Sequence, residues 1–166
     1  MSDSDKVYRG AAIGWTGRGN WGHGLHLGLK HHERVEVVAV ADEGEEDRLA
    51  KQAELSAPKA YADWREMLDK EAKNLDTANV SVPDHMHAPM AMSAMLQGLH
   101  VYCQKPLTHD VYEARALTKY AKKRGLATQM GIQIHSNSEY RTAVKLVHDG
   151  VIGKVKEAHS FSNKRW

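Results

Sequence analysis

The sequence predicts an α/β fold: a doubly wound, mostly parallel sheet with an additional helix and strand at its C-terminal end. Three observations indicate it. Short apolar runs alternate with segments of helical composition. The clearest run, at 35–41, is β-branched and almost continuously apolar, as in a parallel strand covered on both faces. The first run ends in glycine, and strands separated by helices imply parallel pairing through right-handed crossovers.

The elements follow in order along the chain. The predicted strands are 8–14, 35–41, 78–82, 100–103, 127–132 and 154–162, and 58–61 is a short strand or a loop. The predicted helices are 20–32, 45–54, 64–71, 88–97, the segment from Thr108 to Lys123, and the segment from Ser136 or Ser138 to His148.

Local signals support several helix boundaries. Asp63 is expected to cap the helix at 64–71, and Thr108 the long helix that Gly125 ends. Pro89 suits the first turn of 88–97, where a missing N–H has no cost.

Composition excludes several classes of protein. The chain has 166 residues and a net charge of +2, with no basic run of the kind that binds nucleic acid. Its single cysteine, Cys103, excludes an internal disulfide framework and favours a cytoplasmic setting. No segment is apolar enough to span a membrane. We expect one domain over 1–150, with 151–166 beginning another.

A glycine-rich turn follows the first predicted strand. Glycines there allow a sharp turn and a close approach of the backbone to a pyrophosphate. Gly14 and Gly19 fit the first and third positions of G-x-G-x-x-G, but Thr16 stands at the second. The predicted phosphate-binding residues are Gly14, Thr16, Gly17, Arg18 and Gly19. An ordinary strand-to-helix loop is the competing interpretation.

An acidic residue at the end of the next strand strengthens the dinucleotide interpretation. Asp42 can accept hydrogen bonds from an adenosine ribose and would repel a 2′-phosphate, which favours NAD over NADP. Arg48 lies close in sequence and weakens that preference.

Two further strand ends carry polar residues beside prolines. Pro83, Asp84 and His87 follow one strand, and Gln104 and Lys105 follow the next. A lysine at this edge can assist proton transfer during hydride transfer, although a solvated loop lysine fits the spacing equally well.

Together these segments resemble the glucose–fructose oxidoreductase / inositol dehydrogenase family (Gfo/Idh/MocA), most specifically over 82–107 and also over 14–19 and 131–166. The resemblance implies a Rossmann-type NAD domain. It places Lys105 near the nicotinamide and substrate, and Pro83, Asp84, His87 and Gln104 around the cofactor. Gln133 and His135 match a loop that faces the active site. Gln104 replaces the family's usual glutamate, and Thr16 replaces glycine.

The resemblance also implies a second domain that supplies most substrate contacts, of which this sequence contains what resembles only the first strand. Three functions follow as alternatives. The chain is the cofactor domain of a sugar or polyol oxidoreductase, with little turnover alone. Alternatively, it is a stand-alone binding module that dimerises through residues 138–162. Thirdly, it is a small complete reductase with a substrate site shared between subunits, in which Lys105, His87 and His135 are the active-site groups.

Other conspicuous residues favour structural roles. The sequence has 11 histidines, but none shares a known ligand spacing with cysteine or carboxylate, so no metal site is expected. Cys103 is interpreted as a small buried residue rather than a nucleophile.

Overall fold

The structure is a computed structural model that describes residues 6–161. The chain forms two units, one ending at Gly131 and the other beginning at Ile132. The boundary expected at residue 150 stays a prediction, since a compact unit is not the same thing as a domain.

A six-stranded, fully parallel sheet lies at the centre of the first unit, in the order β3-β2-β1-β4-β5-β6. The order in which strands are added to the sheet reverses between β1 and β4, because β2 and β3 lie on one side of β1 and β4, β5 and β6 on the other. Doubly wound sheets bind ligands at such a position. The strands are β1 (Tyr8–Gly14), β2 (Val35–Ala41), β3 (Lys59–Tyr61), β4 (Thr77–Ser81), β5 (His100–Gln104) and β6 (Thr128–Gly131). The predicted α/β doubly wound fold is confirmed.

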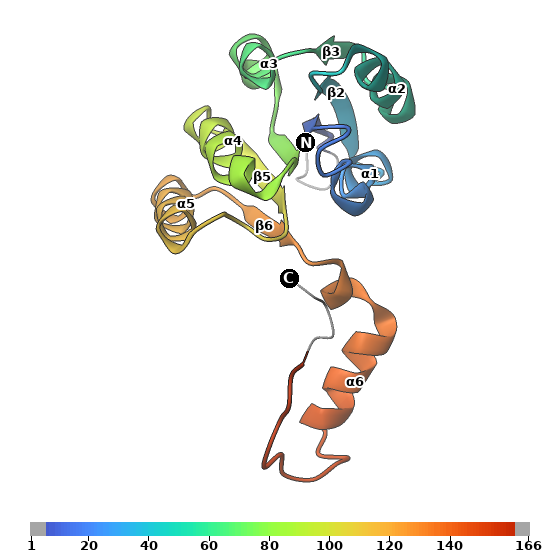
Figure 1. Cartoon of the computed structure of the whole chain (residues 1–166), viewed down its shortest axis with the longest axis vertical. Helices are drawn as coiled ribbons and strands as arrows, with labels where there is room; N and C mark the ends of the chain where they lie inside the picture. The colour runs from blue at the N-terminus through green and yellow to red at the C-terminus, as the bar shows by residue number, and fades with distance from the viewer. Residues whose placement is uncertain (1–5, 162–166) are drawn as a thin grey trace. The chain divides into compact units, whose positions relative to one another are not determined.

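Helices cover both faces of this sheet (Figure 1). Helices α1 and α2 lie on one face, and α3, α4 and α5 lie on the other. The bounds are α1 (Leu27–Lys30), α2 (Glu45–Leu55), α3 (Trp64–Glu71), α4 (Asp84–Leu96) and α5 (Val111–Arg124), with short 3-10 turns η2 (Gly22–Gly24) and η3 (Ala72–Asn74).

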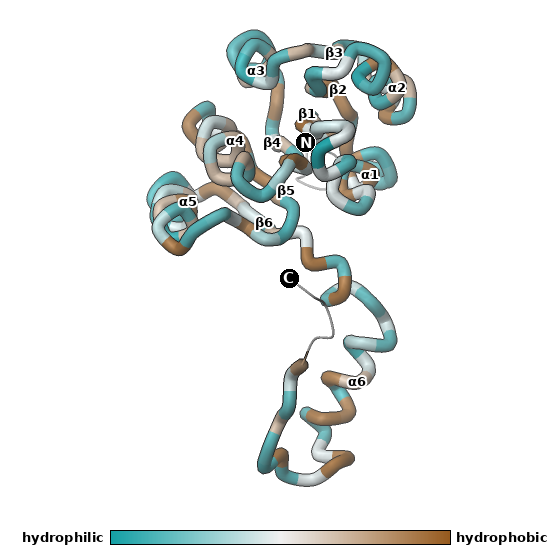
Figure 2. The backbone as a smooth tube through the Cα atoms, viewed as in Figure 1, coloured by the Kyte–Doolittle hydropathy of each residue, from teal (hydrophilic) through white to brown (hydrophobic). Residues whose placement is uncertain are grey.

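The core consists of two apolar layers, one on each face. Val38, Val80 and Met95 belong to the larger layer, beneath α3, α4 and α5. Trp21 and Val40 belong to the smaller layer beneath α1 and α2. Strand β2 is strongly hydrophobic in Figure 2, whereas the outer helices α2, α3 and α5 are largely hydrophilic. This is the pattern expected when each strand is covered on both sides.

Helix boundaries depart from the sequence expectation at three places. Asp110, not Thr108, caps α5, because it forms a reciprocal capping box with Glu113. Helix α4 begins at Asp84, so Pro89 lies inside the helix rather than in its first turn. The predicted helix at 20–32 is reduced to η2 and α1, because the backbone over 20–24 is left-handed. Asp63 caps the start of α3 and Gly125 ends α5, as predicted.

The second unit contains η4 (Gln133–Ser136) and α6 (Ser138–His148), which Asn137 caps. The strand predicted over 154–162 does not form in the described residues 154–161. A strand requires a hydrogen-bonded neighbouring strand, and residues 154–161 pair with none. Ser162 lies outside the described residues. Along the described part of the chain, no helix is long and apolar enough to cross a membrane.

A buried carboxylate joins β3 to α3. Glu71 is almost fully buried and accepts from Lys59 Nζ at 2.8 and 2.9 Å and from the Tyr61 hydroxyl at 2.5 Å. The hydrogen bonds from Lys59 and Tyr61 lower the pKa of Glu71, and burial together with Glu71 raises the pKa of Tyr61 to about 12. The cluster holds the edge strand β3 against α3.

This cluster makes stability depend on pH. Glu71→Gln should lower the free energy of unfolding by about 1–3 kcal/mol at neutral pH, because a charged acceptor is lost. Since the folded pKa of Glu71 lies below the unfolded one, its contribution is complete above the ordinary glutamate pKa of about 4.3 and is lost as the pH falls through the folded pKa. Urea unfolding of both proteins from pH 7 to pH 3 measures this, with exposed Glu66→Gln as control. A constant difference across that range would contradict the assignment.

Candidate functional site

The candidate site lies at the carboxyl ends of β1, β2 and β3. A pocket of about 260 Å³ opens there, and the start of α4 also contributes to its wall. Its lining residues are Ile13, Gly14, Trp15, Ala41, Asp42, Glu43, Ala62, Asp63, Trp64, Arg65, Met86 and Met90. The predicted turn residue Gly14 and the predicted acid Asp42 therefore meet at one place.

The glycine-rich turn has a stricter pattern than the sequence analysis recognised. Gly17, Gly19 and Gly22 match G-x-G-x-x-G at every position, beginning three residues after β1 ends. All three have positive φ, of 77°, 90° and 49°. A Cβ at Gly19 would lie 3.4 Å from the backbone nitrogen of Pro83, whereas one at Gly17 would meet nothing within 4 Å. The turn thus packs against the β4–α4 loop and leaves free space beside the Gly17 Cα, while the Gly17 N–H donates to Asn20 Oδ1 at 2.9 Å.

Asp42 holds this turn from beneath. Its Oδ2 accepts from the Thr16 backbone N–H at 2.9 Å, the Thr16 hydroxyl at 2.8 Å and Trp21 Nε1 at 2.9 Å. Its Oδ1 accepts from the Gly44 N–H at 3.0 Å, and the residue is only 2% exposed. The Thr16 hydroxyl, which was expected to reach a phosphate, donates to Asp42 instead.

Trp21 fixes the backbone that follows the turn. Its side chain is 1% exposed and lies directly against Gly14, where an added Cβ would approach the indole to 2.1 Å. Residues 20–24 all have positive φ, an arrangement that costs about 1–2 kcal/mol for each residue with a side chain. Burial of the indole offsets this cost. Sequence analysis gave Trp21 no role, although its spacing inside the glycine motif was a usable signal.

Charged side chains surround the mouth of the pocket. Glu43 is exposed, and its Oε1 accepts from Trp15 Nε1 at 2.5 Å. Arg18 is exposed in the glycine turn, with its guanidinium carbon 5.1 Å from the centroid of the Trp15 ring. Arg48 Nη1 donates to the carbonyl oxygens of Asp42 and Glu43 at 3.0 and 3.3 Å. The site therefore combines an exposed cation in the glycine turn with an exposed acid beside the pocket.

The contacts of the Gln104 side chain explain why this position carries an amide where the family pattern has glutamate. Its Nε2 donates to the carbonyl oxygen of Gly22, and its Oε1 accepts from the Lys105 backbone N–H at 2.7 Å. The Gln104 side chain is buried, so the Gly22 carbonyl oxygen requires a donor there and the Lys105 N–H requires an acceptor. A carboxylate could satisfy the N–H but would oppose the carbonyl. Gln104 thereby ties the end of β5 to the glycine turn.

Lys105 lies in the β5–α5 loop, and His87 lies in the first turn of α4 beside it. His87 is fully buried, with Nδ1 2.5 Å from the carbonyl oxygen of Pro106 and Nε2 2.8 Å from that of Val82. The imidazole thus links the β4–α4 loop to the β5–α5 loop, in which Lys105 is half-buried and Pro106 follows a cis peptide bond. Pro83 is half-buried and Asp84 exposed at the start of α4. Catalytic and cofactor roles for these residues stay predictions.

Gln133 and His135 belong to the second unit. Both are exposed within η4, and the His135 ring stacks on Tyr140 with centroids 5.9 Å apart. Their participation in the site stays a prediction.

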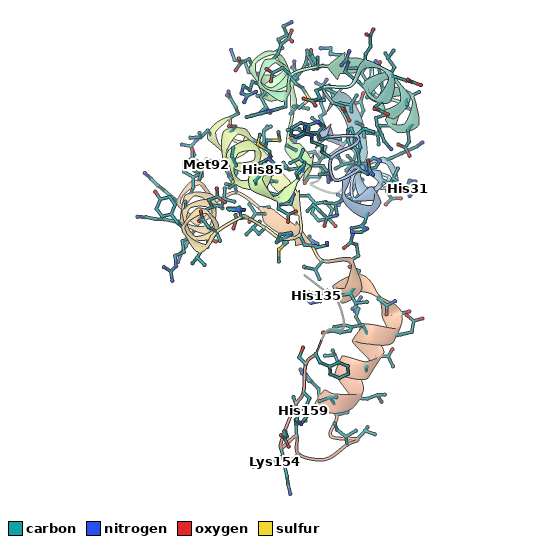
Figure 3. All side chains as sticks on the ribbon, viewed as in Figure 1. His31, His85, Met92, His135, Lys154 and His159 are labelled. Atoms are coloured by element: carbon teal, nitrogen blue, oxygen red, sulfur yellow. The ribbon has the colours of Figure 1, made fainter. Side chains whose placement is uncertain are left out.

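The histidines lie in separate segments of the chain, and Figure 3 labels four of them, His31, His85, His135 and His159. Among residues 6–161, no three His, Cys, Asp or Glu side chains gather in a way that could hold a metal ion. Cys103 is buried, and this burial raises the pKa of its thiol to about 12, so the thiol remains protonated near neutral pH.

Comparison with known proteins identifies a family. The model of the GFO_IDH_MocA oxidoreductase family, described as an NAD-binding Rossmann fold, matches residues 11–132. An inositol 2-dehydrogenase/D-chiro-inositol 3-dehydrogenase of Lactiplantibacillus plantarum is 30% identical over 133 residues, which cover 78% of this chain and 37% of that protein. A 2,7-anhydro-N-acetylneuraminate hydratase of Mediterraneibacter gnavus is 26% identical over 89% of this chain and 38% of its own.

Solved structures show the same relationship. The crystal structure of myo-inositol 2-dehydrogenase from Lactobacillus plantarum has a TM-score of 0.79 and 30% identity, covering 90% of this chain and 43% of that one. A 3-ketoreductase from Actinomadura kijaniata, solved with TDP-benzene and NADP, shares the fold with a TM-score of 0.76 and 24% identity, over 90% of this chain and 46% of its own. This chain spans less than half the length of these relatives.

The Gln104 contacts predict the effect of a nearly isosteric change. Gln104→Glu should lower the free energy of unfolding by about 1–3 kcal/mol at pH 7, because a carboxylate then faces the Gly22 carbonyl oxygen. The loss should shrink at low pH, where the protonated carboxyl donates as the amide does. Chemical denaturation at pH 7 and pH 4 provides the measurement, and exposed Gln129→Glu in β6 is the control. Equal stability of Gln104→Glu and the wild type at pH 7 would refute this role.

Proposed function

Because this chain belongs to the GFO_IDH_MocA oxidoreductase family, whose Rossmann domain binds NAD, we propose that it is the cofactor-binding part of a sugar or polyol oxidoreductase. We expect the first unit, which ends at Gly131, to bind NAD(H) and to turn over little substrate in the absence of further substrate contacts.

One observation carries this proposal: the glycine turn follows β1 at the reversal point between β1 and β4, and the pocket opens beside it at the carboxyl ends of β1, β2 and β3. Gly17 leaves open space where a pyrophosphate would approach, and Arg18 adds a positive charge beside it. The residues present therefore fit a dinucleotide. Gly17, Arg18 and Gly19 would hold its diphosphate, and Trp15 and Glu43 would border its adenosine half.

The other half of the cofactor would lie toward the loops after β4 and β5. A bound nicotinamide supplies hydride chemistry at a carbon that bears a hydroxyl. Pro83 and Asp84 would border the ring. Lys105 would orient the substrate hydroxyl and pass a proton at that oxygen. His87, held by the carbonyl oxygens of Val82 and Pro106, would keep the Lys105 loop in place.

The names of the relatives suggest the substrate class. Inositol, xylose and levoglucosan dehydrogenases and a deoxysugar nucleotide 3-reductase are among the matched proteins. Since the compounds in these names are polyols or sugars, we assign this chain the same class of substrate. Residues beyond the cofactor site would select the specific molecule.

A second candidate function rests on α6. Tyr140, Val144 and Val147 recur at helical spacing, and each is exposed in the structure. Brown and teal segments alternate along this helix in Figure 2. Apolar surface of this kind commonly becomes an interface. Under this alternative, the chain is a cofactor-binding module that dimerises through residues 138–162.

Cofactor binding is the direct test of the first proposal. The protein should bind NADH in calorimetry, and Arg18→Glu should weaken binding about tenfold, because a charge-assisted phosphate contact becomes repulsive. Exposed Arg115→Glu on α5 reverses the same charge away from the site and should leave the affinity unchanged. Absence of heat up to millimolar NAD(H) would count against the proposal.

Dimerisation tests the second. Light scattering of the wild type should give the dimer mass, and Val144→Glu should give the monomer, because a charge then interrupts the apolar stripe of α6. Thr142→Glu adds the same charge to this helix outside that stripe and should remain dimeric. A wild type that stays monomeric at high concentration would remove the idea.

A further inference from the structure

We propose that Glu43, and not Asp42, contacts the adenosine ribose of the cofactor, and that the Glu43 charge makes the site select NAD over its 2′-phosphorylated form. This inference rests on the proposed cofactor function and deepens it.

The surroundings of Asp42 exclude it as the ribose ligand in this arrangement. Two ribose hydroxyls would need both carboxylate oxygens. Oδ2 already accepts from three donors, two on Thr16 and one on Trp21. Oδ1 accepts from the Gly44 N–H, and only 2% of Asp42 is exposed. Releasing the carboxylate to a ligand would leave buried donors on Thr16 and Trp21 unpaired, at a cost of about 1–3 kcal/mol each.

Glu43 is presented in the opposite way. It is exposed, it lines the same pocket, and Trp15 Nε1 fixes its Oε1 at 2.5 Å. Within the described part of the chain, no hydrogen bond to its Oε2 is found. The side chain is therefore oriented by one contact while the other oxygen remains available to ribose hydroxyls.

The pocket has the size of a partial site. Its volume of about 260 Å³ lies below the roughly 300–1,000 Å³ typical of sites that enclose a whole ligand. The indoles of Trp15 and Trp64 and the thioether of Met86 contribute flat or polarisable surface. These features suit a nucleoside, with the diphosphate leaving toward Gly17.

Charge at the pocket mouth determines the form of the cofactor. A 2′-phosphate beside the Glu43 carboxylate would meet a like charge. Two cations lie beside the pocket, and both have partners. Arg48 Nη1 donates to the carbonyl oxygens of Asp42 and Glu43, and Arg65 pairs with Asp63 at 3.3 Å. Removing the Glu43 charge should therefore weaken NAD binding and at the same time relieve the repulsion of NADP.

The test compares NAD(H) and NADP(H) binding to wild type, Glu43→Gln and Glu46→Gln by calorimetry. The wild type should prefer NADH over NADPH. Glu43→Gln should shift the ratio of the two dissociation constants toward NADPH by about tenfold or more, the loss expected for one charge-assisted contact. Glu46→Gln removes an equal charge from an exposed position in the first turn of α2 and should leave the ratio unchanged.

A third variant separates the two acids. Asp42→Asn should lower the thermal unfolding midpoint, because the glycine turn loses its acceptor, whereas Glu43→Gln at an exposed position should leave the midpoint near that of the wild type. A wild type that binds neither cofactor would overturn the proposed function itself. A wild type that prefers NADPH, or a binding wild type whose ratio is unchanged by Glu43→Gln, would overturn this inference alone.

Discussion

The Asp42 carboxylate is the constraint on which the rest of the site depends. Its acceptor oxygens gather the Thr16 N–H and hydroxyl and the Trp21 indole from the turn after β1, and the Gly44 N–H from the turn after β2. Two neighbouring strand ends thus share one buried anion. Because such an anion is costly unless every lone pair is used, the four contacts specify the turn closely.

A second layer of contacts extends this order toward β5. Gln104 joins the Gly22 carbonyl to the Lys105 N–H, and His87 joins the carbonyl oxygens of Val82 and Pro106. The left-handed backbone at 20–24 requires such support, since its strain persists only where the surroundings determine it. Loops after β1, β4 and β5 are therefore fixed to one another before any ligand arrives, and preorganisation of this kind reduces the ordering cost of binding.

Buried and exposed charged side chains of the first unit have different partners. Two buried acids, Asp42 at the site and Glu71 between β3 and α3, hold backbone or neighbouring elements in place. Those that face solvent around the pocket, Arg18 and Glu43, remain able to meet a ligand. The acid most conspicuous in the sequence, Asp42, is thus buried among backbone and side-chain donors, and its neighbour Glu43 is exposed beside the pocket.

The sequence by itself determined the fold class and most elements. Strands β1 and β2 were predicted to the residue, because their apolar composition is local information. Asp63 and Gly125 were recognised as helix boundaries for the same reason, whereas Thr108 was predicted as the cap of α5 where Asp110 caps it, because both residue types can cap a helix and they stand two positions apart. Tertiary structure alone decided the partners of Asp42, Gln104 and His87. Each depends on atoms contributed by distant strands, so no local pattern could reveal whether a polar side chain faces a ligand or a buried N–H or carbonyl group.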